Sequence, residues 1–220
     1  MTHQELAGMI DHAQLKAQAT QVDIDQLCQE AVDFGFRNVC VNPAWTTYCS
    51  KRLDGTPVGI CPVVGFPLGA NTARIKVEEA REAVKNGACE LDMVINIGAL
   101  RSGFTDFVER EIAAVVQAVR GVPVKVILET GDLDDDQKVR GCLAAAEAGA
   151  AFVKTSTGYG RTGASLEDVM LMQRTVGDRM GIKAAGGIRS FATAQALIEA
   201  GATRLGTSAG ARILQELDAA

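Results

Sequence analysis

The sequence has few of the residues that metal sites and nucleic-acid sites require. Its only two histidines, His3 and His12, do not stand at a metal-ligand spacing, which disfavours a metal-dependent active site. Aromatic residues make up 5% of the chain, and 22 basic residues are outnumbered by 27 acidic ones, with no basic block. We therefore expect a protein that has no nucleic-acid partner.

Cysteine pairs and long apolar runs are also absent. The six cysteines are scattered without a C-x-x-C pair, so reduced thiols are favoured over a zinc ribbon or a redox motif. No apolar run approaches the roughly 20 residues that cross a bilayer. Residues 1–10 contain no cationic start before an apolar segment. We expect a cytoplasmic protein with no membrane partner.

Short β-branched runs alternate with helical patterns along all 220 residues. The eight runs lie at residues 9–11, 39–41, 58–60, 91–95, 124–128, 152–154, 182–184 and 204–206. Their spacing fits repeated βα units of a parallel sheet. No linker divides the chain, and none of the runs resembles an edge strand. The sequence therefore predicts an α/β fold, a (β/α)8 TIM barrel that forms one domain over residues 1–220.

The segments between these runs have their own helix signals. Ile112, Val115, Val116 and Val119 share one helical face. The three aspartates at 134–136 could be a metal-binding cluster, but we favour a role in capping a helix and complementing its dipole. These signals support the alternation of strands and helices.

Two lysines lie in strand-like apolar runs, where a lysine is expected only with an oppositely charged partner or a functional role. Lys154 ends one run, and Lys183 lies in the next. On neighbouring strands about 4.8 Å apart, their ammonium groups would face one cavity, so that one amine becomes easier to deprotonate. A neutral amine can attack a carbonyl. The alternative for either lysine alone is a side chain that reaches solvent at the barrel rim.

Asp92 is expected to face the same interior, because strand alternation places it on one face with Val94 and Asn96. A structural ion pair with an interior lysine is one role for this carboxylate. Proton transfer during carbinolamine formation and dehydration is another, and the two are compatible. Asp11, at the end of the first run, is expected to hold a water or to hydrogen-bond a lysine.

Small residues follow the last strands, where barrels of this type bind phosphate. Gly186 and Gly187 follow the seventh run, and residues 206–210 follow the eighth. Thr157 and Gly158 could add donors from the side of the sixth run. The position of these residues, rather than their glycine content, indicates a phosphate site.

Six stretches carry a pattern that covers nearly the whole chain. They are VVGFPLG at 63–69, ELDMVIN at 90–96, KVILET at 125–130, FVKTSTG at 152–158, KAAGGIR at 183–189 and GTS at 206–208. Together they resemble the 2-deoxyribose-5-phosphate aldolase family, whose members are Schiff-base aldolases on a (β/α)8 barrel.

The resemblance implies reversible cleavage of 2-deoxy-D-ribose 5-phosphate to D-glyceraldehyde 3-phosphate and acetaldehyde. It implies that Lys154 forms the imine, that Lys183 perturbs the pKa of Lys154, and that Asp92 takes part in proton transfer. No metal or organic cofactor is implied. Cys40 is expected to border the pocket. The groups implied to hold the substrate phosphate belong to Gly186, Gly187, Gly206 and Ser208.

Two departures from the family pattern affect what we expect. Ala13 stands where the family's first motif usually has a threonine, so a hydroxyl near the acceptor sugar is missing. The chain stops at Ala220 without the terminal tyrosine of many members, so that slower enamine formation, or help from another group, is expected.

Two other functions stay open at this point. A phosphosugar isomerase or synthase barrel would share the phosphate loops, and it predicts that a Lys154→Arg variant keeps some activity. A non-catalytic barrel that binds phosphate ligands predicts binding without turnover. The fold alone cannot choose among them. A homodimer or a higher homo-oligomer is a further expectation.

Overall fold

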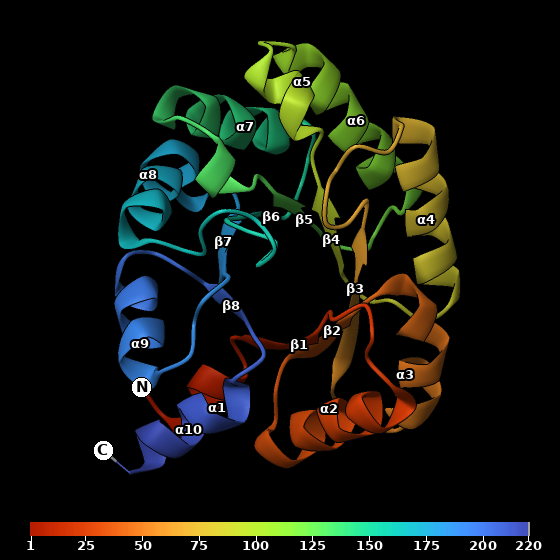
Figure 1. Cartoon of the computed structure of the whole chain (residues 1–220), viewed down its shortest axis with the longest axis vertical. Helices are drawn as coiled ribbons and strands as arrows, with labels where there is room; N and C mark the ends of the chain where they lie inside the picture. The colour runs from red at the N-terminus through yellow and green to blue at the C-terminus, as the bar shows by residue number, and fades with distance from the viewer. Residues whose placement is uncertain (220) are drawn as a thin grey trace.

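Eight parallel strands form a closed barrel in the computed structural model, which describes residues 1–219 (Figure 1). The strands are β1 (Ile10–Gln14), β2 (Asn38–Val41), β3 (Gly59–Val64), β4 (Leu91–Val94), β5 (Val124–Ile127), β6 (Phe152–Lys154), β7 (Gly181–Ala185) and β8 (Arg204–Thr207). Each pairs with its neighbours in chain order, and β8 closes the barrel against β1, with Gly206 opposite Asp11. The predicted (β/α)8 fold is confirmed.

Helices surround the strands on all sides (Figure 1). The α-helices are α1 (His3–Ala7), α2 (Gln21–Phe34), α3 (Thr46–Arg52), α4 (Ala73–Lys85), α5 (Ile97–Arg101), α6 (Thr105–Ala118), α7 (Asp135–Glu147), α8 (Leu166–Val176), α9 (Phe191–Glu199) and α10 (Gly210–Asp218). Three short 3-10 helices are η1 (Pro43–Trp45), η2 (Thr130–Asp132) and η3 (Gly177–Arg179). Helices α1 and α10 pack together, so the first and last helices lie side by side. No helix within residues 1–219 is long and apolar enough to span a bilayer.

The first and third strands extend further than the sequence predicts. Strand β1 continues through polar residues to Gln14, and β3 runs on to Val64, past Pro62. Proline has no N–H to donate, so Pro62 disfavours a strand in the sequence pattern, and the third strand was expected to end at residue 60. In the structure Pro62 stands opposite Val41 of β2. These longer strands reach the end of the barrel where the predicted site residues lie.

Alternation along the strands separates an apolar layer from a polar interior. On β4, Leu91 and Met93 are fully buried in the hydrophobic layer. Asp92, between them, is also fully buried but contacts lysines inside the barrel. The helices therefore supply the apolar cover, and the barrel interior collects charged groups.

The acidic start of α7 caps the helix, as predicted. Asp134 accepts from the N–H of Gln137 at 2.8 Å, and the Gln137 side chain returns the contact to the N–H of Asp134. Because this removes two unsatisfied donors, Asp134→Ala should lower the free energy of unfolding by about 1 kcal/mol. Urea unfolding measures this loss of unfolding free energy. The control is Asp135→Ala, since Asp135 is exposed and should change stability by less than about 0.5 kcal/mol; equal losses would contradict the capping role.

Candidate active site

Asp92 lies at the centre of the charged interior. Its Oδ2 accepts hydrogen bonds from Nζ of Lys154 at 2.6 Å and from Nζ of Lys183 at 2.7 Å. Its Oδ1 accepts from Nζ of Lys125 at 3.0 Å. Lys154 and Lys183 stand directly opposite each other on β6 and β7. The predicted neighbourhood of the two lysines and Asp92 is therefore present, and one carboxylate oxygen joins both amines.

A second group of charges lies beside Asp92. Asp11 accepts from Lys183 at 2.5 Å and from Arg204 at 2.9 Å. Glu90 accepts from Arg204 and from Lys125, each at 2.7 Å. These residues come from the first, fifth, seventh and eighth strands and from the position just before the fourth strand, and their side chains meet only because the sheet closes on itself.

The interior holds more cations than carboxylates. Four cations, Lys125, Lys154, Lys183 and Arg204, face three carboxylates, Asp11, Glu90 and Asp92. Within residues 1–219, Lys125 contacts all three carboxylates, and Lys183 and Arg204 contact two each. Lys154 pairs with Asp92 alone. Lys154 is therefore the cation that the carboxylates hold with the fewest contacts.

Burial and charge compete in setting the protonation of this cluster. Burial alone would raise the pKa of Asp92, but the ammonium groups of Lys125, Lys154 and Lys183 outweigh it and hold that pKa well below its usual value. Burial alone would lower the pKa of Lys183, but Asp11 and Asp92 raise it overall. Asp92 stays a carboxylate at neutral pH, and Lys183 stays an ammonium.

These opposite shifts predict how stability depends on pH. The lowered pKa values of Asp11 and Asp92 mean that their contribution is complete above the unfolded value of about 3.9 and is lost as pH falls, because only the unfolded carboxyls take up protons. The raised pKa of Lys183 gives a contribution that is complete below about pH 10.4 and is lost as pH rises further. Melting temperatures should be nearly level from pH 5 to 9 and fall on both sides; stability that continues to rise below pH 4 would contradict this.

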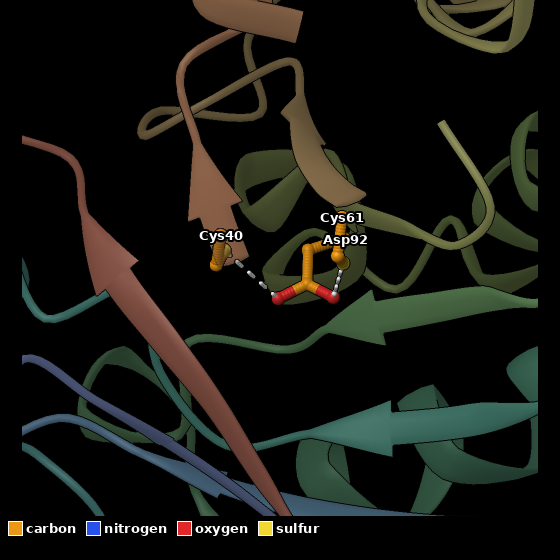
Figure 2. Close-up of side chains that lie close together, drawn as sticks. All are labelled: Cys40, Cys61 and Asp92. Atoms are coloured by element: carbon orange, nitrogen blue, oxygen red, sulfur yellow. Dashed lines mark hydrogen bonds between the residues drawn. The ribbon is translucent and has the colours of Figure 1, made fainter. Parts of the chain in front are cut away.

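Two thiols flank Asp92, as Figure 2 shows. Sγ of Cys61 donates to Oδ1 at 3.1 Å, and Sγ of Cys40 lies 3.9 Å from Oδ2. Two thiols and a carboxylate are a set of metal-ligand types. However, both Asp92 oxygens already accept from ammonium groups, and Nζ of Lys125 is 2.9 Å from Sγ of Cys61. A divalent cation would have to displace these positive charges, so the donor set does not suit one.

A cavity of about 250 Å³ opens above the two lysines. Within the part of the chain that the structure describes, nine of the predicted site residues line it: Lys154, Lys183, Cys40, Thr157, Gly158, Gly186, Gly187, Gly206 and Ser208. Asp92 and Asp11 do not line it and lie beneath the lysines. The amines form the floor, and the glycine loops form one wall.

The glycine wall depends on backbone shapes and spaces that a side chain would disturb. Gly186 and Gly187 have φ values of 93° and 79°, in the region that favours glycine. A Cβ on Gly206 would lie 3.0 Å from Cε of Lys183. Gly206 therefore leaves space for that lysine beside the cavity, in addition to its exposed backbone.

Several residues of the site were not predicted from the sequence. Lys125, Glu90 and Arg204 complete the charge cluster. The signal for Lys125 was available, since it interrupts an apolar run in the same way as Lys183 does. Lys16 and Arg189, which also line the cavity, gave no such signal because a charged residue in a loop is ordinarily solvated.

The chain matches known proteins over nearly its whole length. The sequence pattern of the DeoC/LacD family aldolases matches residues 6–216. A deoxyribose-phosphate aldolase of Methanothermobacter thermautotrophicus is 57% identical over 215 residues, 97% of this chain and 96% of the relative. One of Carboxydothermus hydrogenoformans is 55% identical over 217 residues, 97% of this chain and 95% of the relative.

The solved structures agree with the sequence relatives. The structure described as a unique tetrameric deoxyribose phosphate aldolase from Aeropyrum pernix superposes with a TM-score of 0.93 at 35% identity. It covers 99% of this chain and 92% of that one. The similarity includes the closed barrel and extends beyond it to the chain as a whole.

Proposed function

This chain belongs to the DeoC/LacD family of aldolases, and on that premise we propose that it cleaves 2-deoxy-D-ribose 5-phosphate through an imine on Lys154. The reaction is reversible and yields D-glyceraldehyde 3-phosphate and acetaldehyde. The observation that carries the proposal is the single buried oxygen of Asp92 that joins the amines of Lys154 and Lys183 at the floor of the cavity.

The charge surplus selects the nucleophile. Releasing the proton of Lys154 removes the extra positive charge and breaks only one ion pair. The neutral amine adds to the open-chain aldehyde of the sugar phosphate, and the carbinolamine loses water to give an iminium. Asp92 contacts the amine of Lys154, so it can take a proton from the forming carbinolamine and return it to the departing hydroxyl, while Lys183 remains an ammonium.

The iminium then accepts the electrons of the carbon–carbon bond. The C2–C3 bond breaks, the C3 hydroxyl loses its proton to become the aldehyde of glyceraldehyde 3-phosphate, and an enamine forms on Lys154. Protonation at C2 and hydrolysis release acetaldehyde and restore the amine. The ammonium of Lys183 keeps a positive charge beside the developing intermediates.

The glycine wall is the proposed phosphate subsite. The start of α10 and the loop after β7 present backbone N–H groups, and a phosphate there holds the sugar with its aldehyde toward Lys154. The residues proposed for this role are Gly186, Gly187, Gly206, Ser208, Thr157 and Gly158. Asp11 and Cys40 support the amines without touching the phosphate.

The assembly and the domain organisation are parts of the same proposal. We assign residues 1–220 to one catalytic domain, because the barrel uses strands from both ends of the chain. A homodimer or larger homo-oligomer is supported by the tetrameric A. pernix relative, and light scattering after size exclusion would measure it. A cytoplasmic location stays a prediction from the sequence.

The family match disfavours the isomerase, synthase and binding-protein functions that the sequence left open. The direct test is an assay of the purified protein with 2-deoxyribose 5-phosphate, in which released glyceraldehyde 3-phosphate is reduced by a coupling enzyme and NADH. Ribose 5-phosphate serves as the matched substrate. Turnover of the deoxy sugar with formation of acetaldehyde supports the proposal, and isomerisation without cleavage would overturn it.

A further inference from the structure

Glu129, two residues after the end of β5, has a strained backbone. Its φ of 59° and ψ of 63° lie in the left-handed region, and within residues 1–219 it is the only residue other than glycine with a positive φ. Side chains such as that of glutamate disfavour this region. A strained residue persists where its surroundings fix it, and such residues gather at functional sites.

This backbone conformation directs the Glu129 carboxylate toward the loop that follows Lys154. Glu129 is 2% exposed. Its Oε2 accepts from the backbone N–H of Thr157 at 3.2 Å and from the hydroxyl of the same residue. Its Oε1 is buried without a hydrogen-bond partner among residues 1–219. Burial raises the pKa of Glu129 more than the Thr157 donors lower it. Burial therefore disfavours the charged form of this carboxylate. Its hydrogen bonds both go to Thr157, in the turn formed by residues 157–160.

Hydrogen bonds connect the turn at residues 157–160 to Glu129 on one side and to Leu15 on the other. The Thr157 hydroxyl also accepts from the N–H of Tyr159 at 3.0 Å, and the Tyr159 hydroxyl donates to the carbonyl of Leu15 at 2.7 Å. A Cβ on Gly160 would lie 2.6 Å from Oε1 of Glu129, so the turn packs directly against the carboxylate. One chain of contacts thus joins Glu129 to the opposite rim.

We propose that Glu129 is a positioning residue for the phosphate end of the substrate. It does not line the cavity, whereas Thr157 and Gly158 do. By holding the N–H and the hydroxyl of Thr157, it sets the place of the Gly158 backbone beside Gly186, whose Cα would lie 4.0 Å from a Cβ on Gly158. This inference rests on the proposed function, because it assigns Glu129 to the phosphate subsite of that reaction.

The test compares Glu129→Ala with Glu129→Gln on two substrates. Alanine removes the acceptor and should raise KM for 2-deoxyribose 5-phosphate by about 10-fold. It should change kcat/KM for 2-deoxyribose, which has no phosphate, by less than about 3-fold. Glutamine keeps one acceptor oxygen for Thr157 and should stay within about 3-fold of the original protein on both substrates.

Two further variants keep the outcome decisive. Gly160→Ala leaves Glu129 in place but pushes a methyl group against its carboxylate, so it should give the same selective rise in KM. Asp168→Asn removes a largely buried carboxylate from the Lys138 pair, neither member of which lines the cavity, and should leave both KM values unchanged. If Glu129→Ala and Gly160→Ala lower activity equally on both substrates, Glu129 serves the fold in general and the inference is wrong.

Binding of inorganic phosphate separates this inference from the proposed function. Calorimetry should show about 10-fold weaker phosphate binding by Glu129→Ala than by the original protein, whether or not either protein turns over the sugar. Unchanged phosphate affinity would overturn the role of Glu129. A protein that cleaves neither substrate but binds phosphate through this turn would overturn the aldolase proposal and leave Glu129 in place.

Discussion

Replacing Lys154 by leucine should lower kcat by about 10⁴-fold or more, because leucine cannot add to an aldehyde and the imine is lost. The fold should survive. Without the Lys154 ammonium, three interior cations face three carboxylates, so the substitution removes the surplus charge. Steady-state assays and thermal melts followed by circular dichroism measure the two effects.

Lys154→Arg is the matched control, since it keeps the positive charge but supplies no neutral amine at working pH. An aldolase that uses an imine should lose activity in both variants. An enzyme that uses Lys154 as a charge should keep some activity in the arginine variant alone. Residual turnover above about 1% in Lys154→Leu would be incompatible with an obligatory imine at this position.

Asp92→Asn should reduce both stability and turnover. Four cations would then face only two carboxylates in a fully buried cluster, and breaking such pairs costs roughly 3–5 kcal/mol. The variant also loses the oxygen charge that joins Lys154 and Lys183, so kcat should fall by roughly 10²–10⁴-fold. Urea unfolding and steady-state kinetics measure these changes.

A second substitution separates the two losses. Asp92→Asn combined with Lys125→Met leaves three cations and two carboxylates, which restores the original surplus of one. The double variant should regain about half or more of the lost unfolding free energy, whereas kcat should stay low. Recovery of activity together with stability would show that Asp92 only balances charge and takes no part in proton transfer.

The sequence predicts the centre of the site because strand alternation is a local pattern. Asp92 lies between two apolar residues, Lys154 ends an apolar run and Lys183 lies within one, so each can be assigned to the barrel interior from its own neighbours. Lys125 carries the same signal and could have been included. Arg204 begins its strand, where a charged residue is ordinarily solvated, and its place in the interior becomes visible only when β8 closes on β1.

Other features have no signal in a single sequence. The left-handed backbone of Glu129 gives none, because glycine is the residue that usually marks such a position. Pro62 weakens the pattern of a strand that nevertheless continues to Val64. The surplus of one cation depends on all seven interior charges, which come from strands separated along most of the chain. Such properties follow from closure of the barrel and not from local sequence.

Borohydride trapping tests directly whether Lys154 forms the imine. The protein is incubated with acetaldehyde, reduced, digested and examined by mass spectrometry for an ethylated lysine, with Lys154→Leu as the control. We expect modification at Lys154 and none at Lys183 or Lys125, whose amines the carboxylates hold as ammonium ions. Absence of an adduct, or labelling spread over surface lysines, would mean that Lys154 is not the imine-forming amine.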